Sequence, residues 1–259
     1  MAATDVLLAK ALTRDPARPL LTYYDDATGE RAELSATTLA NWVAKTANLL
    51  QEELALAPGD RVAVLLPTHW QTAAILLATW AAGGVAGTDP EDVAVAFTDL
   101  PRLPRVLAAG AGDVAALSLA PLGGGLDKPV EGAIDFATAV RVQADRFTPY
   151  LPVPDDVPAV DTADGVITAA DLVAQARERA AETGLHDADR VLSVLEWREP
   201  ADWVDGLLGP LAAGASLVLC AHPNPAELIH RAEAEHVTAT LGVSLAGIRA
   251  LPAPGADGE

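Results

Sequence analysis

The chain has 259 residues, with 36 Asp and Glu against 17 Lys and Arg, so its formal net charge is −19. Nucleic acids and anionic membrane surfaces bind positively charged proteins, so this charge argues against either as a partner. Hydrophobic residues make up 51% of the chain but aromatic residues only 4%, which predicts a core built mainly from Ala, Leu and Val.

The first part of the chain alternates between segments of helical and strand-like periodicity, which favours an α/β fold. Ser35 is a suitable N-cap for a helix, and the turn residues "PGD" at 58–60 would end that helix before a buried strand. Paired glycines end the next helix. The pattern predicts helices at 4–14, 37–54 and 69–84, a hairpin at 20–34 around Gly29, and a strand at 61–67.

The segment 148–158 contains four prolines, which remove amide donors and disfavour regular structure. We therefore expect a single compact α/β domain over 1–251, or two lobes, 1–147 and 159–251, joined by this proline-rich segment. The other expected elements are strands at 93–97, 114–119, 190–196, 216–220 and 238–242, helices at 102–110, 134–147, 169–183, 201–213, 224–236 and 244–251, a loop at 121–129 and a disordered tail at 252–259.

The single cysteine excludes an intramolecular disulfide, and nothing in the sequence indicates an oxidising compartment. Cys220 closes the apolar run "SLVLC", which predicts a packed strand residue rather than a nucleophile. No segment reaches the roughly 18 apolar residues of a membrane helix, and the N-terminal stretch lacks the pattern of a signal peptide. These features predict a cytoplasmic protein.

Two motifs resemble sites of chemistry but have simpler interpretations. Ser244 in "GVSLAG" lacks the last glycine of a nucleophile elbow, so we expect it to cap the final helix. Glu227, His230, Glu233 and His236 are spaced three apart, which makes the row spiral around a helix by about 60° per step rather than meet at a metal. We therefore predict no catalytic, cofactor-binding or metal-binding residues, no cofactor and no structural zinc.

Three ordered stretches carry a family resemblance. They are "PGDRVAVLLPTHWQTAAILLATWAAGGVAGTDP" (58–90), "ADRVLSVLEWREPADWVDGLLGPLAAGASLVLC" (188–220) and "HVTATLGVSLAGIRAL" (236–251). Their order and spacing resemble the N-terminal domain of the adenylate-forming superfamily, which includes acyl-CoA synthetases and nonribosomal-peptide adenylation domains. In more detail, the chain resembles a small group of truncated AMP-binding-like proteins that carry no established function. This resemblance implies a Rossmann-like, layered α/β sheet with flanking helices.

Active members of that superfamily carry a loop of the form T-S-G-T-T-G-x-P-K-G, whose amides, hydroxyls and lysine bind phosphates. Here the stretch "PAVDTADGVITAADL" (158–172) has one glycine and no lysine, and its segment Gly165–Thr168 takes the place that follows the loop. The resemblance therefore implies that the loop is missing. The acidic residues of this region, which would repel a triphosphate, are Asp155, Asp156, Asp161 and Asp164.

Two further departures from the family point the same way. Where the family often has a histidine near its acyl or amine pocket, this chain has "EWREP", which places Glu199 near that position, and no histidine lies within ten residues of it. The family's later adenine-binding, aspartate and hinge motifs and its mobile C-terminal domain do not follow, and no lysine occurs after Lys128. These departures disfavour an adenylating enzyme.

The sequence thus predicts a catalytically silent relative of the adenylate-forming enzymes that acts as a binding or interaction module. One alternative is an acid–thiol ligase or adenylating protein that works with a separate domain, and another is a small-molecule sensor with a retained apolar pocket. Because a shortened α/β domain leaves sheet edges and apolar faces to be covered, we also expect a homodimer, or an unidentified protein partner.

Overall fold

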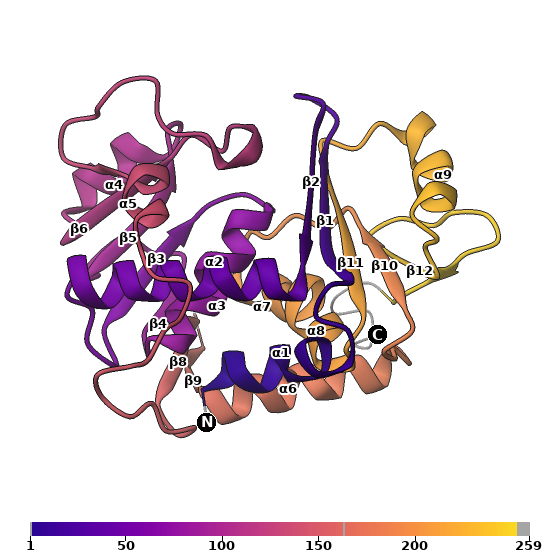
Figure 1. Ribbon diagram of the computed structural model, residues 1–259, viewed down its shortest axis with the longest axis horizontal. Coiled ribbons are helices and arrows are strands. Elements are labelled where there is room, and N and C mark those ends of the chain that lie inside the picture. The colour runs from indigo at the N-terminus through magenta and orange to yellow at the C-terminus, as the bar shows by residue number, and fades with distance from the viewer. Residues whose placement is uncertain (1, 163, 253–259) are drawn as a thin grey trace. The chain divides into compact units, whose positions relative to one another are not determined.

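The computed structural model describes residues 2–162 and 164–252, which form two compact units (Figure 1). Both units are discontinuous in sequence. The proline-rich segment 148–158 lies inside unit 1 rather than at a boundary, and the segment 159–172 belongs to the same unit. Within the described residues, unit 1 consists of 2–5, 40–67 and 71–172, and unit 2 of 6–39, 68–70 and 173–252.

Unit 1 contains a seven-stranded sheet in the order β7-β6-β5-β3-β4-β8-β9. Neighbouring strands are parallel except for β8 and β9, which form an antiparallel hairpin at one edge. The strands are β3 (Arg61–Leu65), β4 (Val85–Gly87), β5 (Val95–Asp99), β6 (Asp113–Leu117), β7 (Ile134–Asp135), β8 (Pro158–Thr162) and β9 (Gly165–Thr168).

Unit 2 contains a six-stranded sheet in the order β13-β12-β10-β11-β1-β2. Its strands are parallel except for the hairpin of β1 and β2, and Figure 1 shows β2, β1, β11 and β10 side by side. The strands are β1 (Pro19–Asp25), β2 (Glu30–Ser35), β10 (Arg190–Ser193), β11 (Ser216–Ala221), β12 (Ala239–Leu241) and β13 (Arg249–Ala250).

Helices connect the parallel strands, as expected for crossover connections. The α-helices are α1 (Ala3–Arg14), α2 (Ala36–Asn48), α3 (Trp70–Ala81), α4 (Leu103–Ala109), α5 (Phe136–Arg141), α6 (Ala169–Glu182), α7 (Pro200–Trp203), α8 (Gly209–Ala213) and α9 (Pro225–Ala234). Five-residue π-helical turns extend α2 (Leu49–Glu53) and join α7 to α8 (Val204–Leu208), and a 3-10 turn lies at Pro121–Gly123. No helix in the described parts of the chain is long and apolar enough to span a membrane.

The predicted α/β class is confirmed, and the cores have the expected composition. In unit 1, residues of β3, β5 and β6 pack with α4 in a cluster of Ala, Val and Leu side chains. The rare aromatic residues fill the largest spaces, as where the rings of Phe97 and Phe136 meet edge to face with centroids 5.8 Å apart. Parallel strands buried on both faces require such continuous apolar runs, and the runs at 61–67 and 216–220 contain β3 and most of β11.

The predicted helix at 244–251 is wrong, and Ser244 therefore caps no helix. Gly242 and Gly247 adopt left-handed φ values of 79° and 78°, which interrupt helical geometry. The backbone instead forms turns and then β13, and the amide of Leu251 donates to the carbonyl of Thr240 at 2.8 Å. The predicted tail at 252–259 lies, apart from its first residue, outside the described residues.

The predicted helix at 134–147 is also shorter in the structure, where only α5 is helical. Asp135 caps it by accepting a hydrogen bond from the amide of Ala137. Beyond α5, the amide side chain of Asn48 donates to the carbonyls of Ala144 and Arg146 at 3.0 and 2.9 Å. Hydrogen bonds to α2 thus replace those that a longer helix would have made.

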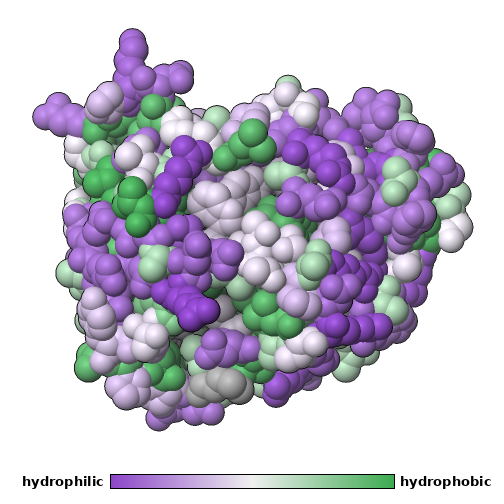
Figure 2. All heavy atoms as spheres, viewed as in Figure 1, coloured by the Kyte–Doolittle hydropathy of each residue, from purple (hydrophilic) through white to green (hydrophobic). Residues whose placement is uncertain are grey.

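The face of the molecule shown in Figure 2 is mainly polar. Hydrophilic residues cover most of the face shown in Figure 2, where hydrophobic residues form small, separate patches. The most exposed large apolar side chains are those of Leu122, at 81%, and Val142, at 78%. Scattered apolar residues of this kind are normal on monomeric proteins.

Truncating a buried leucine of unit 1 should cost far more stability than truncating an exposed one. Leu65 of β3 is 6% exposed within the core cluster, so Leu65→Ala should lower the free energy of unfolding by about 2–5 kcal/mol. Leu122→Ala, which removes the same atoms from the surface, should change it by less than about 0.5 kcal/mol. Denaturant titration measures both. Equal effects would contradict the assigned core.

Candidate functional site

The stretch 158–172, where the family places its phosphate loop, forms a hairpin followed directly by a helix. Strands β8 and β9 pair from Pro158 with Thr168 to Thr162 with Gly165, and the hydroxyl of Thr162 donates to the carbonyl of Gly165 at 2.7 Å. The hydroxyl of Thr168 then accepts a hydrogen bond from the amide of Asp171 and begins α6. The predicted helix at 169–183 is confirmed.

One acid of this region has a basic partner that the sequence analysis missed. Asp161 pairs with Arg61 of β3, with Nη2 and Oδ2 2.6 Å apart. Both β3 and β8 are hydrogen-bonded neighbours of β4, so the pair spans the end of three adjacent strands. The local sequence offers no signal for it, because the two residues lie 100 positions apart. The side chains of Asp155, Asp156 and Asp164 are exposed.

The remaining motifs considered in the sequence have structural roles. Cys220 is 3% exposed within β11, as predicted, and burial raises the pKa of its thiol. The row of acids and histidines does not lie on one helix, because α9 ends at Ala234 and His236 follows in a turn with a φ of 53°. Among the described residues there is no group of three or more His, Cys, Asp or Glu that could hold a metal ion. The absence of zinc remains a prediction.

The segment around Glu199 also has a neighbour that the sequence did not reveal. Glu199 stands at the N-cap of α7, and the preceding residues contact the segment 68–70 of the same unit. The hydroxyl of Thr68 accepts a hydrogen bond from the amide of Trp197 at 2.8 Å and donates to the carbonyl of Leu195 at 3.0 Å. The residue that follows Thr68 in the chain is a histidine, His69, and its side chain packs elsewhere, against Tyr23 and Glu30.

His69 belongs to a buried polar cluster of unit 2. Its side chain is 2% exposed, its Nε2 lies 3.7 Å from Oε2 of Glu30, and its ring meets that of Tyr23 edge to face at 4.4 Å. The indole nitrogen of Trp70 donates to Glu30 at 3.4 Å. Burial, with the negative charges of Asp25 and Glu30, raises the pKa of Tyr23. The cluster is closed to solvent and holds the 68–70 segment in place.

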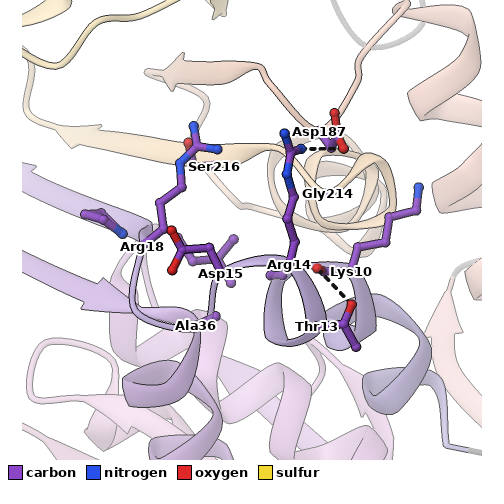
Figure 3. Close-up of a pocket in the computed structure, with 12 residues that line it drawn as sticks. Lys10, Thr13, Arg14, Asp15, Arg18, Ala36, Asp187, Gly214 and Ser216 are labelled. Carbon is purple, nitrogen blue, oxygen red and sulfur yellow. Dashed lines mark hydrogen bonds and ion pairs between the residues drawn. The ribbon is translucent and has the colours of Figure 1, made fainter.

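A cavity of about 300 Å³ opens in unit 2 at the amino ends of its parallel strands (Figure 3). Pro19 and Ser216 are the first residues of β1 and β11, and α1 forms one wall. Three basic and two acidic side chains line it, whereas the whole chain has twice as many acids as bases. The remaining lining includes the apolar residues Ala11, Pro19, Leu20 and Ala36.

Two of the three basic side chains in this cavity have partners within the protein. Arg14 forms an ion pair with Asp187, and Lys10 donates from Nζ to the carbonyl of Ala212, near the end of α8, at 2.8 Å. For the guanidinium of Arg18, the described parts of the chain provide no hydrogen bond or ion pair. Figure 3 shows Arg14 and Arg18 extending in the same direction from the end of α1 and the segment after it.

A second hollow of about 410 Å³ shares Arg18 and Pro19 with the cavity. It is bordered by Glu235, which accepts hydrogen bonds from the hydroxyl of Tyr24 at 2.5 Å, from Arg31 at 3.0 Å and from Arg190. Burial alone would raise the pKa of Glu235, but these hydrogen bonds outweigh it and lower the pKa to about 2. The network fixes the end of α9 against β1, β2 and β10.

Comparison with known proteins identifies the class. The family described as AMP-binding enzyme matches residues 8–88. An acyl-CoA synthetase of Brucella canis superposes with a TM-score of 0.75 at 20% identity, over 93% of this chain and 47% of that one. Acetoacetyl-CoA synthetase from Streptomyces lividans superposes with a TM-score of 0.75 at 24% identity, over 93% and 42%. The fold is that of the N-terminal part of acyl-CoA synthetases, and the chain spans less than half of their length.

A protein related in sequence identifies the family to which the chain belongs. A TIGR03089 family protein of Mycobacterium tuberculosis is 50% identical over 240 residues, which cover 91% of this chain and 96% of the relative. The chain therefore belongs to the TIGR03089 family, and it is related to the adenylate-forming enzymes.

The Glu235 network should make stability depend on pH in the acid range. Because the folded-state pKa near 2 lies below the ordinary value of 4.5, the ionised carboxylate stabilises the fold above pH 4.5, and this contribution is lost as the pH falls toward 2. Glu235→Gln should remove on the order of 1–3 kcal/mol at neutral pH and flatten the profile between about pH 4.5 and 2.

The control is Glu233→Gln, which makes the same change on an exposed side chain of α9. It should leave the profile of unfolding free energy against pH close to that of the wild type. If the two variants gave the same profile, the hydrogen bonds to Glu235 would not carry the stabilisation assigned to them.

Proposed function

We propose that this protein binds a small molecule or a protein partner without adenylating a substrate. The observation that carries the proposal is the hairpin of β8 and β9 in the place where the resemblance puts the phosphate loop. Its strands pair with each other over their length, and the side chain at its centre, Asp161, is a carboxylate already paired with Arg61.

The chemistry of this hairpin opposes a triphosphate. A phosphate loop needs free amides, hydroxyl donors and a positive charge directed at one point. Here three further carboxylates lie within nine positions of Asp161, and all three side chains are exposed. Among the described residues, Arg61 is the cation that pairs with this stretch, and its charge is balanced by Asp161. A triphosphate would have to displace that ion pair and also overcome the surrounding negative charge.

A second candidate function is that of an adenylating protein that works with a separate domain. The ion pair of Arg61 and Asp161 is the observation that supports it. Magnesium bridging Asp161 to a phosphate would need a cation beside it, and Arg61 occupies such a position. The two proposals therefore predict opposite behaviour of Arg61 and Asp161 toward nucleotide, which makes these residues the decisive ones to change.

Calorimetry with ATP and magnesium should show no saturable binding below millimolar ligand, and pyrophosphate exchange should be absent with a panel of carboxylic acids. An active acyl-CoA synthetase assayed in parallel establishes that the exchange assay works. Micromolar ATP binding that is lost in Arg61→Ala or Asp161→Asn, but kept in Asp155→Asn, would overturn the non-adenylating role in favour of the second candidate.

We also propose that the protein forms a homodimer. Strands β7 and β9 stand at the two edges of the unit 1 sheet, and Val166 of β9 is 58% exposed. Unpaired edges with apolar side chains tend to be covered by another chain.

Light scattering at tens of micromolar protein should accordingly give the mass of two chains. Val166→Lys, which puts a charge on the edge strand, should shift the population toward monomer if β9 forms the contact. Leu151→Lys, at an equally exposed position outside the strands, should not. A strict monomer at these concentrations would remove the dimer proposal and leave the fold assignment unaffected.

A further inference from the structure

The cavity at the amino ends of β1 and β11 is lined by more basic than acidic residues, whereas the chain as a whole has more acidic than basic residues. Its basic residues outnumber its acidic ones by three to two, in a chain whose acids outnumber its bases by 36 to 17. In so acidic a protein the field disfavours anions almost everywhere. A concave surface lined by Lys10, Arg14 and Arg18 is therefore one of the few places where a small anion could bind.

Within the described parts of the chain, the contacts inside the cavity leave one of its three cations, Arg18, without a side-chain partner. Asp187 neutralises Arg14, and carbonyl oxygens of α8 accept hydrogen bonds from Lys10. Arg18 keeps its charge under all ordinary conditions and has no partner among the described residues, while its side chain borders both hollows. Asp15 lies nearby, but its carboxylate accepts a hydrogen bond from the amide of Ala17.

The number of available cations limits the charge of the ligand. A single free guanidinium presents two parallel donors that match one carboxylate in bidentate geometry. A triphosphate would require several further positive groups or amides, and these are already engaged here. The available group thus fits a monoanion.

The size and polarity of the cavity indicate which group the carboxylate of the ligand should carry. A volume of about 300 Å³ lies at the small end of the range for ligand pockets. Leu20 and Ala36 are buried beneath the cavity at 4% and 1% exposure, and Ala11 and Pro19 add apolar surface. A short hydrocarbon group would bury this surface, while a fully hydrated ion would not.

We propose that this cavity binds a small organic monocarboxylate, with Arg18 holding the carboxylate and the surface of Leu20, Pro19 and Ala11 holding a short apolar body. Open α/β sheets usually bind ligands at the carboxyl ends of their strands, so this site lies at the opposite edge from the one the fold would suggest. This inference rests on the proposed binding function, and it adds the chemical class of the ligand.

The test is a titration of the full chain with hexanoate in the absence of nucleotide, followed by calorimetry or by ligand-observed NMR. Saturable binding is expected, with affinity at least about tenfold weaker for the neutral isostere hexanamide. Arg18→Gln should weaken hexanoate binding by about 10- to 100-fold, as expected for loss of a charge-assisted pair. Ala11→Leu, which fills the apolar part of the cavity from a helical position, should also weaken it.

The matched control is Arg105→Gln, because Arg105 is exposed on α4, lines none of these hollows and changes the net charge by the same amount. It should leave hexanoate binding unchanged. Thermal unfolding of each variant shows whether it is folded. Absence of saturable hexanoate binding, equal binding to Arg18→Gln and wild type, or inorganic phosphate competing as well as hexanoate would overturn the proposal. Pyrophosphate exchange tests the non-adenylating role separately, so the two proposals can fail independently.

Discussion

The parallel pairing of β1 with β11 is the interaction on which unit 2 depends. It aligns Leu21 with Leu217 and continues to Asp25 and Ala221, which joins segments almost 200 residues apart. An ion pair and a hydrogen bond reinforce the same junction, since Asp26 pairs with Arg231 at 2.5 Å and Oδ1 of Asp25 lies 2.8 Å from Nδ1 of His222. The cavity beside Arg18 depends on this pairing, because Pro19 of β1 and Ser216 of β11 both line it. The network around Glu235 is held by residues of β1, β2 and β10.

Sequence reasoning succeeded where the determining forces are local. The helix α6 begins at a threonine cap and buries an apolar face, and β11 is a short apolar run between turn residues, so the expected ranges 169–183 and 216–220 agree with the structure. The predicted helices at 134–147 and 244–251 are wrong over most of their length, because contacts with other parts of the chain outweigh the helix-favouring composition of these segments. In the segment 134–147, the side-chain amide of Asn48 donates hydrogen bonds to the carbonyls of Ala144 and Arg146. In the segment 244–251, two glycines turn the chain so that β13 pairs with β12.

The candidate sites are harder to predict than the fold, because each brings together segments that carry no functional motif of their own. Nothing near Asp161 in the sequence indicates Arg61, and the pair exists because β3 and β8 are both neighbours of β4. Likewise, Arg18 lies in a loop between a helix and a strand, and only the arrangement of β1 and β11 makes it part of a cavity. Deriving such sites requires strand order, which local periodicity does not provide.

The discontinuity of the two units has a consequence for how the chain acquires its structure. The partner of β1, the strand β11, follows almost 200 residues later in the chain. The entropy of closing so long a loop is lost before any contact compensates for it. The sheet of unit 1, whose strands all come from 61–168, can form first, while β1 and β2 wait as an unpaired hairpin of marginal stability. Until β11 has been made, the edge of β1 that pairs with it in the folded sheet is exposed, and this is the kind of surface that molecular chaperones shield.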